Sequence, residues 1–259
     1  MKENLKSKLF IGTSGIAVPG NKKAFPLDFQ SKSRLNYYAT HFNSIEINST
    51  FYQTPMPATF LKWALDVPED FKFTIKLSKQ VTHGKDLQFD LKIIDAFCAA
   101  AAALANKKGM LLLQFPGKIS IQYFTQVEAI LAQLDEQLPQ NKWHTAIEFR
   151  NADWYVSETV ELLAQYNSSL VLHDFSKAKN AFSQQKTKTV YLRFHGPAGD
   201  YRGSYTDQFL ALQADNINEW VSAQKNVYVY FNNTMGNAWQ NALALKAFCQ
   251  ERGSMAEFK

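Results

Sequence analysis

FDLKIIDAFCAAAAALANKKGMLLLQFPG, residues 89–117, contains a helix and the strand that follows it, the unit from which this chain is built. An Ala-rich body, lysines in the last turn and Gly109 as the stop predict a helix over residues 89–108. The run MLLLQF after the glycine is almost continuously apolar, as is usual for strands that are buried on both faces of a parallel sheet. The stretch therefore predicts one helix–strand unit of an α/β protein.

The same unit recurs along the chain. Strands are expected at residues 8–13, 44–49, 71–77, 109–115, 144–149, 169–173, 189–194 and 226–231. Helices are expected at residues 33–41, 58–65, 89–108, 120–134, 157–166, 177–183, 206–223 and 237–251, and the pattern at 177–183 is poor. Strand and helix alternate eight times, which predicts parallel strands joined by right-handed helical crossovers.

This alternation favours one architecture. Eight units in about 250 residues fit a closed (β/α)₈ TIM barrel better than an open doubly wound sheet, which usually has fewer strands and a Gly-rich nucleotide turn. No linker, solenoid repeat or low-complexity tract interrupts the sequence, so residues 1–259 are predicted to form a single α/β domain. The longest insertions follow the first and the seventh strand.

The composition agrees with one large buried core and is unlike that of disordered or collagen-like proteins. Hydrophobic residues make up 46% of the 259, and the formal net charge of +5 is spread without a dense basic block, so it favours acidic partners only weakly. Cys98 and Cys249 lie far apart in expected helices and are expected to be reduced thiols. The sequence has neither a secretory signal nor an apolar run of about 20 residues, so we expect a cytoplasmic location without membrane contact.

Several of the expected strands carry polar side chains at alternate positions. The outer face of a barrel strand meets apolar helix faces, so these polar sets should point into the barrel. The last inward residue of each strand should lie near the C-terminal mouth, where barrel active sites are found. The expected mouth set is Asn48, Lys76, Gln114, Arg150, His173, His195 and Asn232, with Glu46, Glu148 and Arg193 one layer below.

Two interpretations of this polar set remain open. The ions could pair with one another and merely fill the barrel. Burying charges costs several kcal/mol each unless the geometry is excellent, and apolar packing could have replaced them. For the set as a whole, a dense group of this kind favours a functional site.

Seven ordered segments resemble a known family. They are IGTSG (11–15), EINSTFYQTP (46–55), FKFTIKLSKQVTH (71–83), LLLQFPG (111–117), AIEFRNADWY (146–155), YLRFHG (191–196) and VYVYFNNTMGNAWQNA (227–242). Together they resemble the YecE-like barrels, which are labelled a domain of unknown function. The resemblance implies a (β/α)₈ barrel and no agreed reaction. The family usually has aromatic residues after GTSG, whereas residues 16–19 here are IAVP, so the resemblance implies no stacking or lid role for that loop.

The mouth set predicts an enzyme that acts on a small anionic molecule, phosphorylated or carboxylated, by general acid–base chemistry. The reaction class stays open between hydrolase, lyase and isomerase. The catalytic candidates are His195, Glu148, His173 and Lys76. Glu148 would orient its neighbours, or act as a base if its pKa is raised, and Lys76 could also form a Schiff base. The substrate-binding candidates, several of them aromatic residues expected at the rim, are Asn48, Phe51, Tyr52, Gln114, Arg150, Trp154, Arg193, Arg202, Tyr205 and Asn232.

The loops after the seventh and eighth strands, HGPAGDYRGSY and FNNTMGNA, offer glycines and a helix start that could cradle a phosphate. No cofactor is predicted. A divalent metal on Glu46, Glu148, His173 and His195 remains an alternative, although the nearby Lys and Arg would repel a cation. Two further functions stay open: a nucleic-acid enzyme or binder, and a ligand-binding module without turnover. The sequence does not indicate an oligomeric state.

Overall fold

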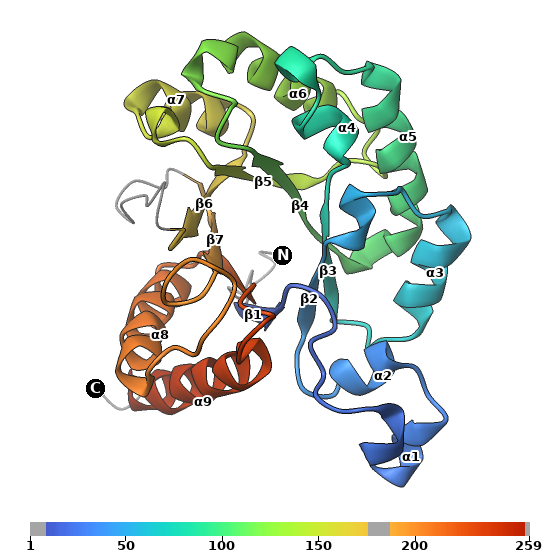
Figure 1. The fold of residues 1–259 in the computed structure, drawn as a ribbon, viewed down its shortest axis with the longest axis vertical. Coiled ribbons are helices and arrows are strands. Elements are labelled where there is room, and N and C mark those ends of the chain that lie inside the picture. Colours follow the sequence, from blue (N-terminus) through green and yellow to red (C-terminus); the bar gives the residue numbers. More distant parts are fainter. Residues whose placement is uncertain (1–8, 176–186, 257–259) are drawn as a thin grey trace, which may run out of the picture.

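The computed structural model describes residues 9–175 and 187–256. One sheet of eight strands runs through this part of the chain, and every neighbouring pair is parallel. The strands are β1 (Leu9–Thr13), β2 (Ser44–Ile47), β3 (Lys72–Lys76), β4 (Lys108–Phe115), β5 (His144–Phe149), β6 (Ser169–His173), β7 (Thr189–Phe194) and β8 (Asn226–Phe231). Their order, β1-β8-β7-β6-β5-β4-β3-β2, curls into a nearly closed ring (Figure 1). The predicted (β/α)₈ TIM barrel is confirmed.

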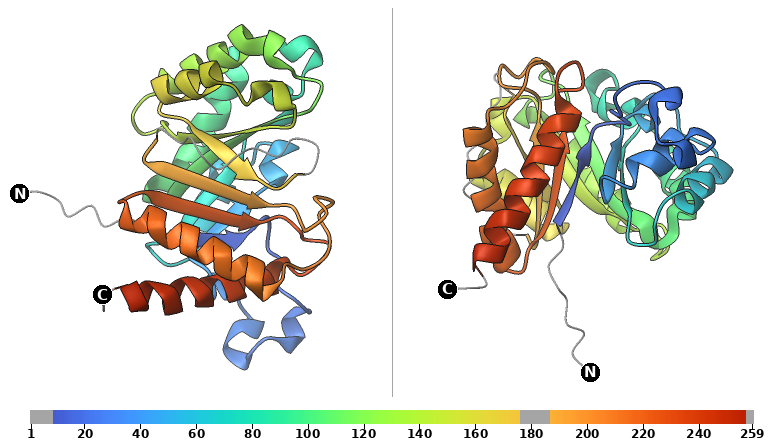
Figure 2. Two further views of the ribbon diagram at one scale, coloured as in Figure 1. Left: turned by 90° about the vertical axis from the view of Figure 1, so that its left-hand side faces the viewer. Right: turned by 90° about the horizontal axis from the view of Figure 1, so that it is seen from below.

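Helices surround this ring on its outside, as the three views show (Figures 1 and 2). The α-helices are α1 (Leu27–Gln30), α2 (Arg34–Tyr38), α3 (Pro57–Leu65), α4 (Lys79–Thr82), α5 (Leu91–Ala101), α6 (Phe124–Asp135), α7 (Ser157–Gln165), α8 (Asp207–Ser222) and α9 (Ala238–Ala256). Short 3₁₀ turns lie at Lys22–Ala24, Ser49–Phe51, Lys85–Leu87, Ala102–Lys107, Ile121–Tyr123 and Ala152–Trp154. Within residues 9–175 and 187–256, no helix combines the length and apolarity needed to cross a membrane.

The helix expected at residues 89–108 ends earlier than its composition suggests. Regular α-helix stops at Ala101, and a 3₁₀ segment follows in which Ala105 has a φ of 49°. Lys107 then turns inward, where its Nζ donates to the carbonyls of Ala64 and Val67 at 2.7 and 2.8 Å. These contacts join Lys107 to the last turn of α3 and to the residues after it, and such long-range partners are not visible in the local sequence pattern. The helix expected at 177–183 lies outside the described residues.

The barrel interior has two layers of different chemistry. The lower layer is a cluster of buried, mostly apolar side chains that includes three tyrosines. Its members are Phe10, Met110, Leu112, Ala146, Val171, Tyr191, Tyr228 and Tyr230. Tyr230 is fully buried, and its hydroxyl shares hydrogen bonds with the hydroxyls of Ser44 and Thr74. The layer toward the C-terminal ends of the strands is charged. A much larger apolar core fills the space between strands and helices.

The ring closes between β1 and β2 with few strand contacts. The two strands share one isolated bridge, between Ser14 and Glu46, and Gly15 N–H donates to the Glu46 carbonyl at 2.7 Å. We call the place where β1 and β2 meet the joint of the barrel. Glu46 therefore lies at this joint as well as inside the barrel.

Tyr38 of α2 completes this joint from outside the strands. Its hydroxyl accepts from the Thr13 N–H at 2.8 Å and donates to the Ser44 carbonyl at 3.0 Å. Gly12 makes room for this arrangement, because a Cβ at that position would lie 2.0 Å from the Ser44 carbonyl oxygen. A side chain at position 12 would therefore keep the two strands apart.

Candidate functional site

Arg193 of β7 lies at the centre of the charged layer. Its Nε and Nη2 donate to Glu46 of β2, with Nη2 2.9 Å from Oε1, and its Nη1 donates to Glu148 of β5 at 2.9 Å. Only 2% of Arg193 is exposed, and both carboxylates are fully buried. All three guanidinium nitrogens are occupied by the chain itself. In this structure Arg193 links two carboxylates across the barrel, and its expected role in substrate binding stays a prediction.

Glu46 is held as an ionised counterion. Besides Arg193, it accepts from Ser14 Oγ at 2.6 Å, Tyr191 OH at 2.5 Å and Asn48 Nδ2 at 3.1 Å. Burial alone would raise the pKa of Glu46, but the Arg193 charge and these hydrogen bonds outweigh it and hold the pKa below its usual value. Asn48, expected to touch substrate, is half-buried and orients this carboxylate.

Glu148 is likewise ionised, which bears on its expected role as a base. Burial opposes ionisation, yet the charges of Arg150 and Arg193 hold the pKa of Glu148 well below its ordinary value. A base near neutral pH needs the opposite shift. Glu148 therefore acts as an orienting group, because its Oε1 accepts from Arg150 Nε.

Arg150, which follows β5, is oriented on two sides. Its Nε is bound to Glu148, its Nη2 lies 2.9 Å from His195 Nε2, and its guanidinium lies over the Phe175 ring at 3.9 Å. Its side chain is 7% exposed. Within residues 9–175 and 187–256, Nη1 donates to no protein atom. The Nη1 N–H groups of an otherwise fixed guanidinium are thus left to donate to a ligand.

His195 directly follows β7 and is fully buried. Its Nε2 faces the N–H groups of Arg150 at 2.9 Å and of Arg193 at 3.3 Å, so Nε2 accepts and the ring proton is assigned to Nδ1. Burial lowers the pKa of His195, in agreement with a neutral ring. Nδ1 lies 3.4 Å from Asp174 Oδ1 without a well-formed hydrogen bond. We call Glu46, Glu148, Arg150, Arg193 and His195 the buried network.

Asp174 borders the buried network and was missed by the sequence analysis. Its Oδ1 accepts from the His195 backbone N–H at 2.7 Å, its Oδ2 accepts from the Tyr205 hydroxyl, and its side chain is 21% exposed. Tyr205, expected at the rim, is instead buried and positions Asp174, and its hydroxyl also accepts from Gly196 N–H at 2.6 Å. The available signal was position: Asp174 is the first residue after β6.

His173, the last residue of β6, is a hydrogen-bonded interior histidine. Its Nδ1 accepts from the Phe175 N–H at 3.2 Å, and its Nε2 faces Tyr155 OH at 2.8 Å and the Phe149 carbonyl at 3.3 Å. Burial lowers its pKa to about 4. His173 is therefore neutral near pH 7 and is occupied on both ring nitrogens.

Lys76, the last residue of β3, is 8% exposed. Its Nζ donates to Gln114 Oε1 at 2.8 Å and lies 4.0 Å from the centroid of the Phe51 ring. Burial lowers the pKa of Lys76 to about 8, and the nearby Arg193 charge acts in the same direction. The predicted residues Lys76, Gln114 and Phe51 thus lie together.

Other expected rim residues do not join this group. Trp154 is fully buried, stacks on Phe149 with ring centroids 4.2 Å apart, and donates Nε1 to the Ile119 carbonyl at 2.8 Å. Its expected place at the rim is therefore wrong, because the ring packs between strand and helix. Tyr52 is 71% exposed and Arg202 is exposed on the loop after β7, while Asn232 is buried at the end of β8.

The loops expected to cradle phosphate are bound to each other. Met235 N–H donates to the Tyr201 carbonyl at 3.1 Å, and Asn237 N–H donates to the Gly203 carbonyl at 3.0 Å. A Cβ on Gly236 would lie 2.3 Å from the Gly203 oxygen, so the two loops are in close contact. These amides are used within the fold, and the expected cradle is not formed by them. Within the described part of the chain, no three His, Cys, Asp or Glu side chains are grouped to hold a metal.

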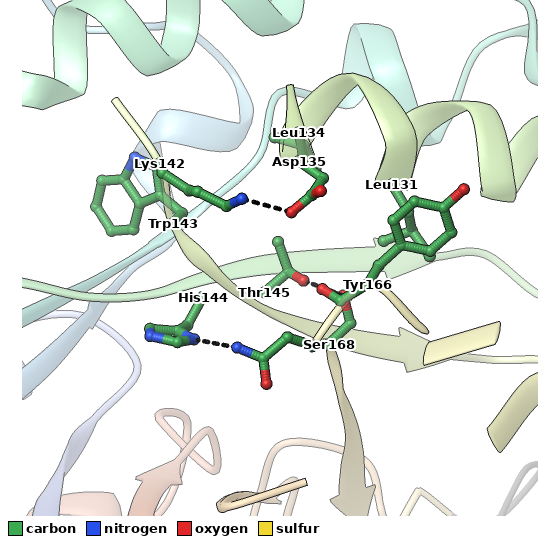
Figure 3. Close-up of a pocket in the computed structure, with 10 residues that line it drawn as sticks. Leu131, Leu134, Asp135, Lys142, Trp143, His144, Thr145, Tyr166 and Ser168 are labelled. Atoms are coloured by element: carbon green, nitrogen blue, oxygen red, sulfur yellow. Dashed lines mark hydrogen bonds and ion pairs between the residues drawn. The ribbon is translucent and has the colours of Figure 1, made fainter. Parts of the chain in front are cut away.

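In the described part of the chain, two cavities are lined by none of the five residues of the buried network. One of about 510 Å³ lies between the loop after β1, α2 and the end of α3, and Asn48 and Trp63 are among its lining residues. The other, of about 250 Å³, lies at the N-terminal ends of β5 and β6 (Figure 3). Its polar groups are paired with one another: Lys142 with Asp135 at 2.6 Å, and His144 with Asn167 at 3.2 Å.

Two proteins with similar sequences have names that state no function. The UPF0759 protein YunF of Bacillus subtilis (strain 168) is 25% identical over 264 residues, which cover 88% of this chain and 89% of YunF. The UPF0759 protein YecE of Escherichia coli (strain K12) is 33% identical over 82 residues, which cover 32% of this chain and 30% of YecE.

Solved structures share the fold. A DUF72 family protein from Enterococcus faecalis V583 has a TM-score of 0.77 and 22% identity, with 94% of this chain and 98% of that chain covered. A DUF72 family protein from Thermotoga maritima MSB8 has a TM-score of 0.74 and 25% identity, with 94% and 99% covered. The family model described as "Protein of unknown function DUF72" matches residues 10–257. This chain is therefore a member of the DUF72 family, in agreement with its resemblance to the YecE-like barrels.

Proposed function

We propose that this protein is an enzyme that acts on a small anionic molecule, phosphorylated or carboxylated, by general acid–base chemistry beside Arg150 and His195. The observation that carries this proposal is Arg150 Nη1, which has no acceptor within the described residues although the rest of the guanidinium is fixed. A fixed guanidinium with one open side suits a carboxylate or phosphate oxygen. Lys76 adds a second cation near it.

The acid–base step follows from the pairing around His195. A neutral imidazole whose Nδ1 faces a carboxylate can take up a proton at Nε2, because Asp174 would stabilise the imidazolium that forms. Nε2 is occupied by Arg150 Nη2 in the structure. An anion that draws Nη2 away would leave Nε2 with only the longer contact to Arg193 Nη1, at 3.3 Å, so ligand binding and proton uptake are coupled in this proposal.

Calorimetric titration with inorganic phosphate and with succinate tests the anion site. We expect binding by the wild type and a loss of roughly tenfold or more in affinity for Arg150→Gln, because one charge-assisted hydrogen bond is worth about 1.5–3 kcal/mol. Arg252→Gln, which removes an arginine of α9 that pairs with Asp215 of α8, is the matched control and should bind as the wild type does. Equal binding by wild type and Arg150→Gln would contradict the proposal.

Proton uptake tests the coupling to His195. Titrations of phosphate in buffers of different ionisation enthalpy report the number of protons taken up on binding. We expect net uptake by the wild type that is lost in His195→Gln, with thermal unfolding used to confirm that this variant is folded. Binding without any His195-dependent uptake would leave an anion site and refute the acid–base role.

A second candidate function, nucleic-acid binding, has one observation in its favour. Tyr52 is 71% exposed beside the mouth, and Lys79 Nζ lies 5.6 Å from its ring centroid, an arrangement suited to stacking a base next to a phosphate. Fluorescence anisotropy with a labelled single-stranded oligonucleotide would then give an affinity that falls steeply with salt and falls again in Tyr52→Ala. Absence of binding at low salt would remove this candidate.

A further inference from the structure

Two buried lysines in this protein have contrasting surroundings. Lys107 donates to the carbonyls of Ala64 and Val67 and lies 3.6 Å from a Glu69 carboxylate oxygen, so its Nζ has three oxygen partners. Lys76 is buried to a similar degree, 8% against 7% exposed, but has a single hydrogen bond, to the neutral amide of Gln114. Within the described part of the chain it forms no ion pair with a carboxylate.

The remaining surroundings of Lys76 are an aromatic ring and positive charge. Phe51 covers its Nζ at 4.0 Å, and the charges of Arg193 and Arg150 act against its protonation, partly offset by Glu148 and Glu46. With a pKa of about 8, roughly a tenth of the amine is neutral at pH 7. A buried amine with an available lone pair is a nucleophile, a role that desolvation beside other cations favours.

We propose that Lys76 Nζ forms an imine with the carbonyl group of a small anionic substrate whose carboxylate or phosphate is bound by Arg150. This inference rests on the proposed function and names the substrate class for the same site: 2-oxo acids and phosphorylated aldehydes or ketones. Three geometric facts carry it: a buried amine whose one side-chain hydrogen bond goes to the neutral amide of Gln114, its place at the C-terminal end of β3, and the open Nη1 of Arg150 in the same layer.

The step is balanced without any oxidant or reductant. The Nζ lone pair attacks the carbonyl carbon, an N–C bond forms, and a proton from nitrogen passes to the carbonyl oxygen to give a carbinolamine. The carbinolamine hydroxyl then takes a proton from solvent and leaves as water, and the nitrogen lone pair forms the C=N bond, so that a protonated imine with one N–H remains. Such a cation is an electron sink for proton removal or bond cleavage at the neighbouring carbon, which agrees with a lyase or isomerase.

Reductive trapping tests the inference. The full chain is incubated with sodium cyanoborohydride and pyruvate, glyoxylate or glyceraldehyde 3-phosphate, with acetone as the uncharged carbonyl control. Intact mass and peptide mapping then locate the added group. We expect one adduct at Lys76, formed at least ten times faster with an anionic carbonyl compound than the adducts at exposed Lys79, and no adduct at Lys107.

Variants separate this inference from the proposed function. Lys76→Arg keeps the charge and should lose the adduct, and Lys76→Met serves if the arginine variant unfolds. Arg150→Gln should slow trapping of pyruvate roughly tenfold or more and leave trapping of acetone unchanged. Adducts spread over surface lysines without preference for Lys76 would overturn the imine. If phosphate still binds in an Arg150-dependent manner, the anion site survives that result, and if it does not, both proposals fall.

Discussion

Burial lowers the pKa values of the histidines in the C-terminal layer and raises those of the carboxylates. The neighbouring charges and hydrogen-bond partners decide which protonation state each group has. For His173 and His195, burial lowers the pKa and the surrounding donors leave both rings neutral. For Glu46 and Glu148, burial opposes ionisation, but adjacent guanidinium groups outweigh it. The layer thus has fixed charges on its Glu and Arg residues, while its histidines stay neutral.

At the residue scale, His173 predicts a loss of stability in mild acid. The unfolded histidine binds a proton near pH 6.5 and the folded one only near pH 4, so between these values the unfolded state binds more protons. The free energy of unfolding should therefore fall as the pH falls through this window, by roughly 3 kcal/mol from this residue. Urea unfolding at a series of pH values measures it.

His173→Gln is the comparison for that series. It removes the titrating group and keeps a polar side chain that can bond to Tyr155 OH. We expect a lower stability at pH 7 but a clearly shallower decline toward pH 4. Parallel curves for wild type and variant would show that His173 does not carry the effect.

At the scale of elements, β1 and β2 meet through side chains more than through a ladder. Neighbours such as β4 and β5 pair over six residues in register, whereas β1 and β2 have one bridge. The gap between them is filled by Tyr38 and by the backbone contact that Gly12 allows. Because Glu46 lies at this joint, the same contact that closes the ring also fixes the buried network.

Gly12→Ala should therefore be severely destabilising. A Cβ would lie 2.0 Å from the Ser44 carbonyl oxygen and 2.7 Å from Tyr38 OH, so β2 or α2 would have to move. We expect a loss of at least about 3 kcal/mol in the free energy of unfolding, measured with urea.

Gly253→Ala in α9 is the matched control. Its nearest neighbour, the Asn218 amide, is 3.9 Å from the new Cβ, which is ordinary contact. Alanine in a helix interior should add about 0.5–1 kcal/mol. A Gly12→Ala protein as stable as the wild type would mean that the joint can open without cost.

At the scale of the whole molecule, the barrel is a ring with one weak joint. Beyond Tyr38, the joint depends on Asn43, whose amide accepts from the Ile11 N–H at 3.1 Å and donates to the Leu9 carbonyl at 2.8 Å. A hydrogen bond from a strand amide to a side chain breaks when the helix or loop that carries the side chain shifts. A hydrogen bond between two paired strands breaks only when the strands separate. Local opening should therefore begin between β1 and β2.

Native-state hydrogen exchange measures this. The amides of Ile11 and Thr13 should exchange faster than the amide of Leu113 in β4. Tyr38→Phe should accelerate exchange at Thr13 and lower stability by about 1–3 kcal/mol, because a buried amide loses its acceptor.

Tyr37→Phe is the control for that variant. Within the described residues the Tyr37 hydroxyl has no hydrogen-bond partner, so its loss should leave exchange at Thr13 unchanged. Uniform exchange around the ring, or equal effects of the two substitutions, would refute a weak joint.

The fold and the general location of the site follow from local patterns. Apolar periodicity predicted every strand of the described barrel, and alternation placed Glu46, Glu148 and Arg193 inside it. Trp154 shows the limit of this reasoning: it follows a strand end as rim residues do, yet its ring lies in the core. Asp174 shows the converse, since a single acidic residue after β6 gave no periodic signal.

The sequence by itself determined the order of elements, the parallel barrel and the inward side of each strand, because these depend on the spacing of apolar and polar residues along the chain. Only the tertiary structure decided which charged side chains are fully paired within the protein and which keep an N–H group without an acceptor. Arg193 is occupied and Arg150 is partly open because partners from β2, β5 and β7 meet across the barrel. Those partners lie on strands that are not neighbours in the sheet, so only closure of the ring brings them together.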